Sequence, residues 1–457
     1  MKTIIYNARL VDAKIDSQGM VVCDGGKIES IFLGDFSTEA KAKKSAVENS
    51  STAAFIDAGG LALLPAFIDM HAHFRYPGQT QKEDLDSGLA AARNAGFGTL
   101  VLMPNTNPVV SNRKIALSVM EEAKRINEKN GARTRIFQTV SITKDFGGID
   151  TSAIDELDSK AFPVISEDGH DVGSASVMLE GMEKAGRKGI IVACHCEDVE
   201  LAKSARPFRQ AALKLMKENV IPAGIFNVEL PNVPESVNAE IDRNLTRANE
   251  ILALAEDAAT ERNLEIAALA KCHVHICHCS TKISMDAVRN AKVRGIDCSV
   301  EVTPHHLGLT GTALPNIRAL VNPPLRSESD RRALIEALRD GTADCIGTDH
   351  APHTMEDKAA GSPGFTGLET AFAVVNTVLC KEEGFSLSRL SELMSANPAK
   401  LLKIDTGRLE VGKMAEFALV DPDEEWTVSA ADFKSKGKST PLEGRKLVGK
   451  VHGTIFA

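Results

Sequence analysis

The chain has 457 residues, of which 43% are hydrophobic and 25% are charged, and its formal net charge is -9. This length is too great for one ordinary domain and suits a large α/β barrel with a small attached domain. The acidic balance argues against a nucleic-acid-binding surface, and no apolar run approaches the length that spans a membrane.

The N-terminus and the cysteines indicate the compartment. Asn7, Arg9 and Asp12 interrupt the first apolar stretch, so the start of the chain does not resemble a secretory signal. The nine cysteines are an odd number, and several lie inside apolar, strand-like runs. We expect buried, reduced thiols there rather than disulfides. Both observations predict a cytoplasmic protein.

Residues 1–60 contain short segments of alternating polarity, at 2–8 and 20–32, with a turn at Gly25-Gly26. This pattern is typical of β-strands. It predicts the N-terminal part of a small β domain.

From residue 61 the pattern changes to short apolar runs separated by helical stretches, which is typical of parallel βα units. Eight such runs occur, and eight is the number that closes a (β/α)8 TIM barrel. The expected strands are 61–72, 98–103, 133–141, 161–166, 189–195, 272–278, 298–303 and 343–349. We assign residues 61–400 to this barrel.

Helices are predicted between and after these strands, over 82–95, 112–129, 174–187, 281–293, 327–338 and 387–402. The connection 197–271 is unusually long, with a polar segment around 222–234 and a helical tail over 239–270. A connection of this length can be a lid, a dimer contact or a solvent-exposed elaboration.

Residues 401–457 return to short strands, with turns predicted at Gly412, Pro422 and Pro441. Because both ends of the chain are β-rich, we expect them to build one composite β-sandwich beside the barrel.

The most informative segment is Ala66-Phe-Ile-Asp-Met-His71-Ala-His73-Phe-Arg75, at the end of the first barrel strand. At the strand period of two, His71, His73 and Arg75 share one face. Two neutral imidazoles can bind one divalent ion, and an arginine beyond them can hold an anionic group in a bidentate fork. Two histidines satisfied by their neighbours would give the same short pattern, so the assignment depends on the other strand ends.

Polar side chains also follow the other barrel strands at their C-terminal ends, where barrel enzymes carry reactive groups. They are Glu167, Asp168, His195, His278 and Asp349. Considered one at a time, these residues have ordinary structural roles as well. Asp168 could belong to a turn, His195 could be a core residue, and Asp349 could cap a helix. Together with the two strand-one histidines, the set matches a two-metal hydrolase, in which a carboxylate bridges two cations and a shared hydroxide is the nucleophile. A carboxylate beside that hydroxide, here Asp349, is the natural general acid and base.

The motifs resemble those of the dihydroorotases, in the bacterial form, within the amidohydrolase superfamily, and the resemblance covers nearly the whole chain. They follow in family order as Pro65-Ala-Phe-Ile-Asp-Met-His71-Ala-His73-Phe-Arg75-Tyr-Pro77-Gly, Lys82-Glu83-Asp84, Met103-Pro-Asn105-Thr106, Asp168-Gly169, His195-Cys-Glu-Asp198, His278-Cys-Ser-Thr, Thr303-Pro-His305-His306, Asn322-Pro-Pro-Leu-Arg326 and Asp349-His-Ala-Pro-His353.

The resemblance implies a role for each matching residue. His71 and His73 would bind one metal and His195 and His278 the other. Asp168 would bridge the two, and Asp349 would contact a metal while it carries the proton. The resemblance further implies two Zn2+ per subunit, a substrate carboxylate held by Arg75, Asn105 and His353, and a ring amide contacted by Asn322.

Some positions depart from the family pattern. Tyr76 stands where an acidic residue is usual, Glu167 stands where aspartate is usual, and some relatives reverse the pair Gly364-Phe365. Asp168 keeps the family's spacing to His195, so we assign the bridge to it and retain Glu167 as the alternative. Related dihydropyrimidinases and allantoinases use a carboxylated lysine at the end of strand four. Here the nearest lysine, Lys160, precedes that strand, which argues against this version.

The resemblance implies reversible closure of N-carbamoyl-L-aspartate to (S)-dihydroorotate in de novo pyrimidine (UMP) synthesis. The nearest alternative is an allantoinase or a dihydropyrimidinase, but a neutral ring would leave the cationic clamp at Arg75 unpaired. A non-catalytic barrel that serves as an assembly partner is the alternative from another class. We expect a homodimer or higher homo-oligomer, with association with another pyrimidine-pathway enzyme as a further expectation.

Overall fold

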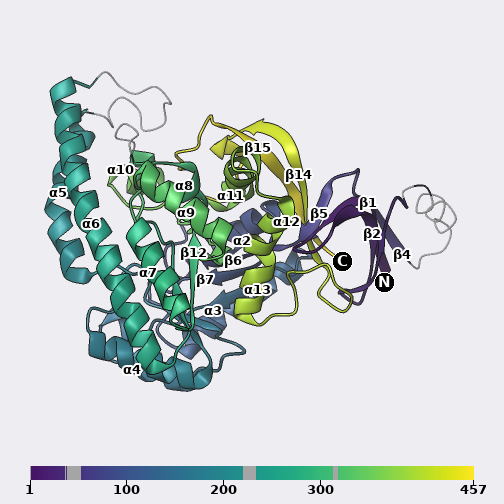
Figure 1. Cartoon of the computed structure of the whole chain (residues 1–457), viewed down its shortest axis with the longest axis horizontal. Helices are drawn as coiled ribbons and strands as arrows, with labels where there is room; N and C mark the ends of the chain where they lie inside the picture. Colours follow the sequence, from purple (N-terminus) through teal and green to yellow (C-terminus); the bar gives the residue numbers. More distant parts are fainter. Residues whose placement is uncertain (1, 37, 39–52, 220–232, 312–316) are drawn as a thin grey trace.

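The structure is a computed structural model that describes residues 2–36, 38, 53–219, 233–311 and 317–457. A barrel of parallel strands surrounded by helices forms the main body, and a sheet built from both ends of the chain lies beside it (Figure 1). The fold class predicted from the sequence is therefore confirmed. The domain limits 1–60, 61–400 and 401–457 stay a prediction.

The barrel consists of two parallel ladders that join at both sides. Ser166 N donates to Val140 O at 3.2 Å on one side, while His73 N donates to His350 O at 2.9 Å and Asp349 N to His71 O at 3.0 Å on the other. These bonds close the ring. The ladders comprise β6 (Phe67–Ala72), β7 (Phe97–Leu102) and β8 (Arg135–Gln138), and β9 (Val164–Ser166), β10 (Ile191–Cys194), β11 (Val274–Ile276), β12 (Cys298–Val302) and β13 (Cys345–Ile346).

The first predicted strand, 61–72, is two strands in the structure, so the prediction of one continuous strand is wrong. β5 (Ala62–Pro65) pairs with strands from the chain ends, and only β6 belongs to the barrel. Pro65 has no N–H for a ladder, which suits the end of a strand. The next amide, Ala66 N, donates to Glu416 O at 2.9 Å, and the chain passes from one sheet to the other at this point.

The helices around the barrel begin at side-chain caps that the sequence supplies. Asp84 accepts from Ser87 N at 2.9 Å, and Asn112 accepts from Ile115 N at 3.0 Å, which satisfies amides that have no partner within the helix. The helices are α2 (Leu85–Asn94), α3 (Arg113–Lys129), α4 (Ala175–Lys188), α5 (Val199–Asn219), α6 (Glu235–Ala270), α7 (Lys282–Val293), α8 (Pro304–Gly308), α9 (Glu328–Asp340), α10 (Met355–Ala359), α11 (Leu368–Val375), α12 (Leu387–Ser391) and α13 (Asn397–Leu402). The predicted helix 387–402 is α12, a π-helical turn and α13 in succession.

The two ends of the chain share one seven-stranded sheet with the order β15-β14-β5-β1-β2-β3, in which β4 also pairs with β1. Its apolar core includes Ile5, Leu10, Val21, Leu63 and Phe417. The N-terminal strands are β1 (Lys2–Val11), β2 (Asp16–Asp24), β3 (Lys27–Leu33) and β4 (Ala53–Asp57), and the C-terminal ones are β14 (Glu416–Thr427) and β15 (Lys446–Phe456). The composite domain predicted from both ends is confirmed.

The predicted turn at Pro422 is wrong. Pro422 lies within β14, where the pairing with β15 shifts register between Asp421 and Glu425. A bulge of this kind removes the ladder hydrogen bond that proline cannot donate. The strand therefore continues past a residue whose type predicts a turn.

The long connection 197–271 contains α5 and α6, which pack against each other (Figure 1). Along its length α6 also packs against α4 and α7, so it is one of the helices of the barrel ring. Most of the polar segment around 222–234 lies outside the described residues.

The nine cysteines are free and eight of them are buried, as predicted. Within the described ranges, no helix combines the length and the apolar character needed to cross a membrane.

Candidate metal centre and substrate clamp

The C-terminal ends of the barrel strands bring six predicted side chains together. His71 is the second-last residue of β6, His73 follows β6, and the others follow β9, β10, β11 and β13. Each of the six residues is at most 8% exposed. The six-residue cluster is His71, His73, Asp168, His195, His278 and Asp349.

Asp168 lies at the centre of the six-residue cluster. Its Oδ1 is 3.4 Å from His71 Nε2, 3.3 Å from His195 Nδ1 and 3.6 Å from His278 Nε2. Its Oδ2 is 3.6 Å from His73 Nε2. One carboxylate therefore faces both histidine pairs.

Asp349 approaches the cluster from β13. Its Oδ1 lies 3.1 Å from His73 Nε2 and 3.7 Å from His71 Nε2. The carboxylate thus faces the two histidines of the first barrel strand. The isolated bridge Ala72–His350 places the end of β6 beside the segment that follows β13.

These separations fit divalent ions. Ligand atoms about 2.0–2.1 Å from a tetrahedral zinc ion lie about 3.3–3.4 Å from one another, and most of the distances above are close to that value. Among the described residues, three buried atoms of the cluster have no hydrogen-bond partner: His71 Nε2, Asp168 Oδ1 and His278 Nδ1. Since neutral imidazoles and carboxylates are ligands of first-row divalent ions, the residues present fit a metal centre.

The charges of the cluster lower the pKa of its carboxyl groups. Burial would raise the pKa of Asp168, but the nearby imidazoles of His71, His195 and His278 hold it well below its usual range. Burial is likewise outweighed at Asp349, whose pKa is lowered chiefly by the hydrogen bond to His73. Both groups are ionised at neutral pH, the state in which carboxylates bind metals.

The backbone is strained where the chain leaves four barrel strands. Arg75, Cys196, His278 and Asp349 have φ values of 52°, 50°, 33° and 46°. Residues other than glycine rarely adopt positive φ, and such conformations persist where the surrounding structure determines them, often at functional sites.

The predicted substrate clamp is formed around Arg75. Its Nη2 lies 3.2 Å from His353 Nε2, and its Nε donates to Pro352 O at 3.3 Å. The Arg75 residue is only 8% exposed. The structure thus brings Arg75 and His353 together, as the resemblance implies.

The two predicted asparagines contact the cluster directly. Asn105 Nδ2 donates to Asp168 Oδ2 at 3.0 Å, and its Oδ1 lies 2.9 Å from His73 Nδ1. Asn322 Nδ2 donates to Glu197 Oε2 at 2.8 Å and lies 3.3 Å from His195 Nε2. The sequence did not single out these links between the asparagines and the histidines.

The clamp and the cluster share one cavity of about 250 Å3. Every predicted site residue except His71 lines it, and His71 lies beneath, fully buried. Gly364 also lines it with a φ of 109°, and a Cβ there would lie 2.7 Å from Ala351 Cβ. The order Gly364-Phe365, one of the departures noted above, therefore suits this backbone because a phenylalanine at 364 would be strained and would collide.

The two alternatives for the bridging group lie elsewhere. Glu167 accepts hydrogen bonds from Thr143 N at 2.7 Å and from the Thr143 hydroxyl, and burial raises its pKa to about 7. Lys160 lies before β9, beside Gly189 and Lys403, at the end of the barrel opposite to Asp168.

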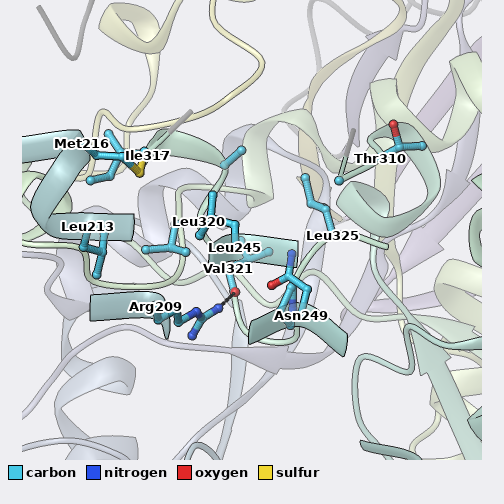
Figure 2. Close-up of a pocket in the computed structure, with 13 residues that line it drawn as sticks. Arg209, Leu213, Met216, Leu245, Asn249, Thr310, Ile317, Leu320, Val321 and Leu325 are labelled. Atoms are coloured by element: carbon cyan, nitrogen blue, oxygen red, sulfur yellow. Dashed lines mark hydrogen bonds between the residues drawn. The ribbon is translucent and has the colours of Figure 1, made fainter. Parts of the chain in front are cut away.

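A second, apolar cavity of about 90 Å3 lies beside the first, between α5, α6 and residues 317–325 (Figure 2). Arg209 lines it, and its Nη2 donates to Val321 O at 2.9 Å. Its Nη1 donates to Asn322 Oδ1 at 3.4 Å. This arginine therefore connects α5 to a predicted substrate residue, and a lone arginine within a helix gives no sequence signal for that role.

Comparisons with known proteins show the family of the chain. The model of the amidohydrolase family matches residues 242–456, and that of dihydro-orotase-like proteins matches residues 60–207. A dihydroorotase of Clostridium botulinum is 36% identical over 100% of this chain and 98% of its own length. A dihydroorotase of Caldanaerobacter subterraneus is 37% identical over 89% of this chain and 87% of its own length.

Among solved structures, the L-hydantoinase (dihydropyrimidinase) of Arthrobacter aurescens superposes with a TM-score of 0.78 at 23% identity, covering 99% of this chain and 94% of that one. This similarity supports the fold alone. The match to the Clostridium botulinum dihydroorotase extends over the whole chain. The chain therefore belongs to the dihydroorotase family, within the amidohydrolases.

Proposed function

We propose that this enzyme opens the ring amide of dihydroorotate by hydrolysis and, in reverse, closes N-carbamoyl-L-aspartate with loss of water. The observation that carries the substrate assignment is the environment of Arg75. Its two hydrogen-bond partners, Pro352 O and His353 Nε2, are neutral. A buried guanidinium with neutral partners favours an anionic ligand, and the carboxylate of dihydroorotate would supply that charge.

The proposed roles of the other residues follow from their positions around the cavity. His71 and His73 would hold one metal ion and His195 and His278 the other, with Asp168 shared between them and Asp349 beside the first. Two divalent ions bound there would lower the pKa of water and draw charge from the carbonyl under attack. Asp349 would take the proton of the attacking water and deliver it to the ring nitrogen as the amide bond breaks.

The remaining polar side chains would orient the substrate. Asn322, held by Glu197 and Arg209, would contact the ring amide. Asn105 would join Arg75 and His353 at the substrate carboxylate, and its bonds to Asp168 and His73 support a fixed orientation.

We further propose two Zn2+ per subunit, a place in pyrimidine synthesis, a cytoplasmic location and a homodimer or higher homo-oligomer. Nine free cysteines support a reducing compartment. Metal analysis tests the cofactor: we expect about two equivalents per chain, whereas a protein that binds no metal would favour the non-catalytic barrel.

The substrate assignment is tested by Arg75→Met, which removes the charge and keeps most of the volume. We expect kcat/KM for dihydroorotate to fall about 100- to 1000-fold, because loss of one partner of a buried charge pair costs about 2–5 kcal/mol. The zinc content should be unchanged. Arg125→Met, at an exposed arginine paired with Glu122 on α3, is the matched control, and unchanged turnover in Arg75→Met would contradict the clamp.

A further inference from the structure

Glu301 on β12 is a fully buried carboxylate that touches the metal centre from within the barrel. We propose that Glu301 is a positioning residue that fixes His71 and His278 in the orientation that binds metal, and so raises the metal affinity of the centre. The inference rests on the proposed metal roles of these two histidines.

One oxygen of Glu301 contacts a residue of each of the two proposed metal sites. Glu301 Oε1 lies 3.0 Å from His71 Nδ1 and accepts a hydrogen bond from His278 N at 3.1 Å. His71 belongs to the proposed first metal site and His278 to the second. A single carboxylate therefore contacts a side chain of one ligand pair and the main chain of the other.

The contact with His71 determines which ring nitrogen is free. A carboxylate only accepts hydrogen bonds, so His71 Nδ1 must donate to Glu301 and carry the ring proton. His71 Nε2 then presents its lone pair to the cluster, where it lies 3.4 Å from Asp168 Oδ1. A carboxylate behind a ligating imidazole fixes its tautomer and raises its basicity.

The contact with His278 is made by its main-chain amide. His278 has a φ of 33°, a conformation that residues other than glycine rarely adopt. The hydrogen bond from its amide to Glu301 helps to hold this conformation. Its ring can then face Asp168 and His195, at 3.6 Å and 3.0 Å from its Nε2.

A histidine of β11 lies on the other side of Glu301. Glu301 Oε2 lies 3.3 Å from His275 Nε2, and His275 Nδ1 lies 2.8 Å from Ser299 Oγ. Both His275 and Ser299 are buried.

The neighbouring strand leaves space for this carboxylate. A Cβ added at Gly347, directly after β13, would overlap the Glu301 carboxyl group. A residue without a side chain at 347 therefore leaves room for the Glu301 carboxylate. The sequence alone did not indicate a role for Glu301.

The test is zinc affinity, measured on the full-length protein by competition with a chelator. We expect Glu301→Gln, which keeps the shape and removes the charge, to bind zinc about 10- to 100-fold more weakly, the range found for carboxylates behind ligating histidines. The visible spectrum of the Co2+-loaded variant should also change, since the ligand field at His71 changes. Glu416→Gln, at a buried glutamate of β14 in the other sheet, is the control and should keep wild-type affinity.

Gly347→Ala is the second variant, since it keeps the carboxylate but forces it to move. It should weaken zinc binding in the same direction, so the inference stays testable if Glu301→Gln does not fold. His71→Asn separates this inference from the proposed function. If His71→Asn kept full zinc affinity, the metal role of His71 would be wrong. If His71→Asn lost zinc while Glu301→Gln and Gly347→Ala bound it like wild type, only the positioning role would be overturned.

Discussion

His353 lies close to three cationic side chains, those of Arg75, Lys82 and Lys358. Burial, followed by the charges of Arg75, Lys82 and Lys358, lowers its pKa to about 3. The ring is therefore neutral at pH 7, and it accepts a hydrogen bond from Arg75 at Nε2. The pair thus carries one positive charge, which matches one substrate carboxylate.

This lowered pKa predicts an acid-sensitive fold. The unfolded chain binds a proton at His353 below about pH 6.5, while the folded chain does so only near pH 3. The stabilising contribution is therefore present above about pH 6.5 and is lost as the pH falls toward 3. In urea unfolding of the metal-free proteins, wild type should lose stability relative to His353→Gln between pH 7 and pH 4.5.

His452→Gln is the control for this substitution, because His452 lies on the surface strand β15, paired with Glu424. If the difference in the free energy of unfolding between wild type and His353→Gln were the same at pH 7 and at pH 4.5, the neighbours of His353 would not hold its ring neutral.

At the scale of single residues, the sequence predicts the site residues at the strand ends, but it does not predict the residues that contact them from other elements. His71, His73, Asp168, His195, His278 and Asp349 could be found because parallel strands end at one rim. Glu301 lies inside a buried strand and Arg209 in a distant helix. Their partners are far away in the sequence, so local pattern could not connect them to the site.

At the scale of elements, α6 links the long connection to the candidate metal centre. Glu256 on α6 accepts hydrogen bonds from Ser280 N at 2.8 Å and Thr281 N at 3.0 Å, two and three residues after His278. Arg326 Nη2 donates to the same carboxylate at 3.0 Å. From the sequence we expected this connection to be a lid, a dimer contact or an exposed elaboration. None of these roles includes its contacts with the loop that carries His278.

We predict that Glu256→Gln destabilises the fold. The substitution leaves the buried guanidinium of Arg326 without its counter-charge, and breaking a buried ion pair costs about 3–5 kcal/mol. Thermal or urea unfolding measures this loss. Glu240→Gln, at an exposed position of the same helix, should be neutral, and equal stabilities of the two variants would contradict the role assigned to Glu256.

The boundaries of elements could be predicted less well than their existence. All eight barrel strands were expected, yet the structure divides the first at Pro65 and carries β14 past Pro422. In both places pairing with a strand far away in the sequence decides where the strand ends. Proline alone predicts a break or a turn, and it cannot report which partner strand is available.

At the scale of the whole molecule, the C-terminal part of the chain supports the rim of the site. Thr366 N donates to Ser439 O at 3.0 Å, and Thr366 Oγ1 donates to Gly437 O at 2.8 Å. Lys436 N donates to Glu83 Oε1 at 3.2 Å. The sequence predicted that the two ends meet, but these contacts come from irregular segments, for which periodicity carries no information.

The central claim is that this barrel acts on a cyclic amide with a carboxylate. The most direct test is a steady-state assay of the zinc-loaded protein with dihydroorotate, dihydrouracil and allantoin in parallel. Because a buried site built for a charged group rejects analogues that lack it, we predict kcat/KM for dihydroorotate at least about 1000-fold above the other two. Equal or faster turnover of dihydrouracil or allantoin would contradict the account.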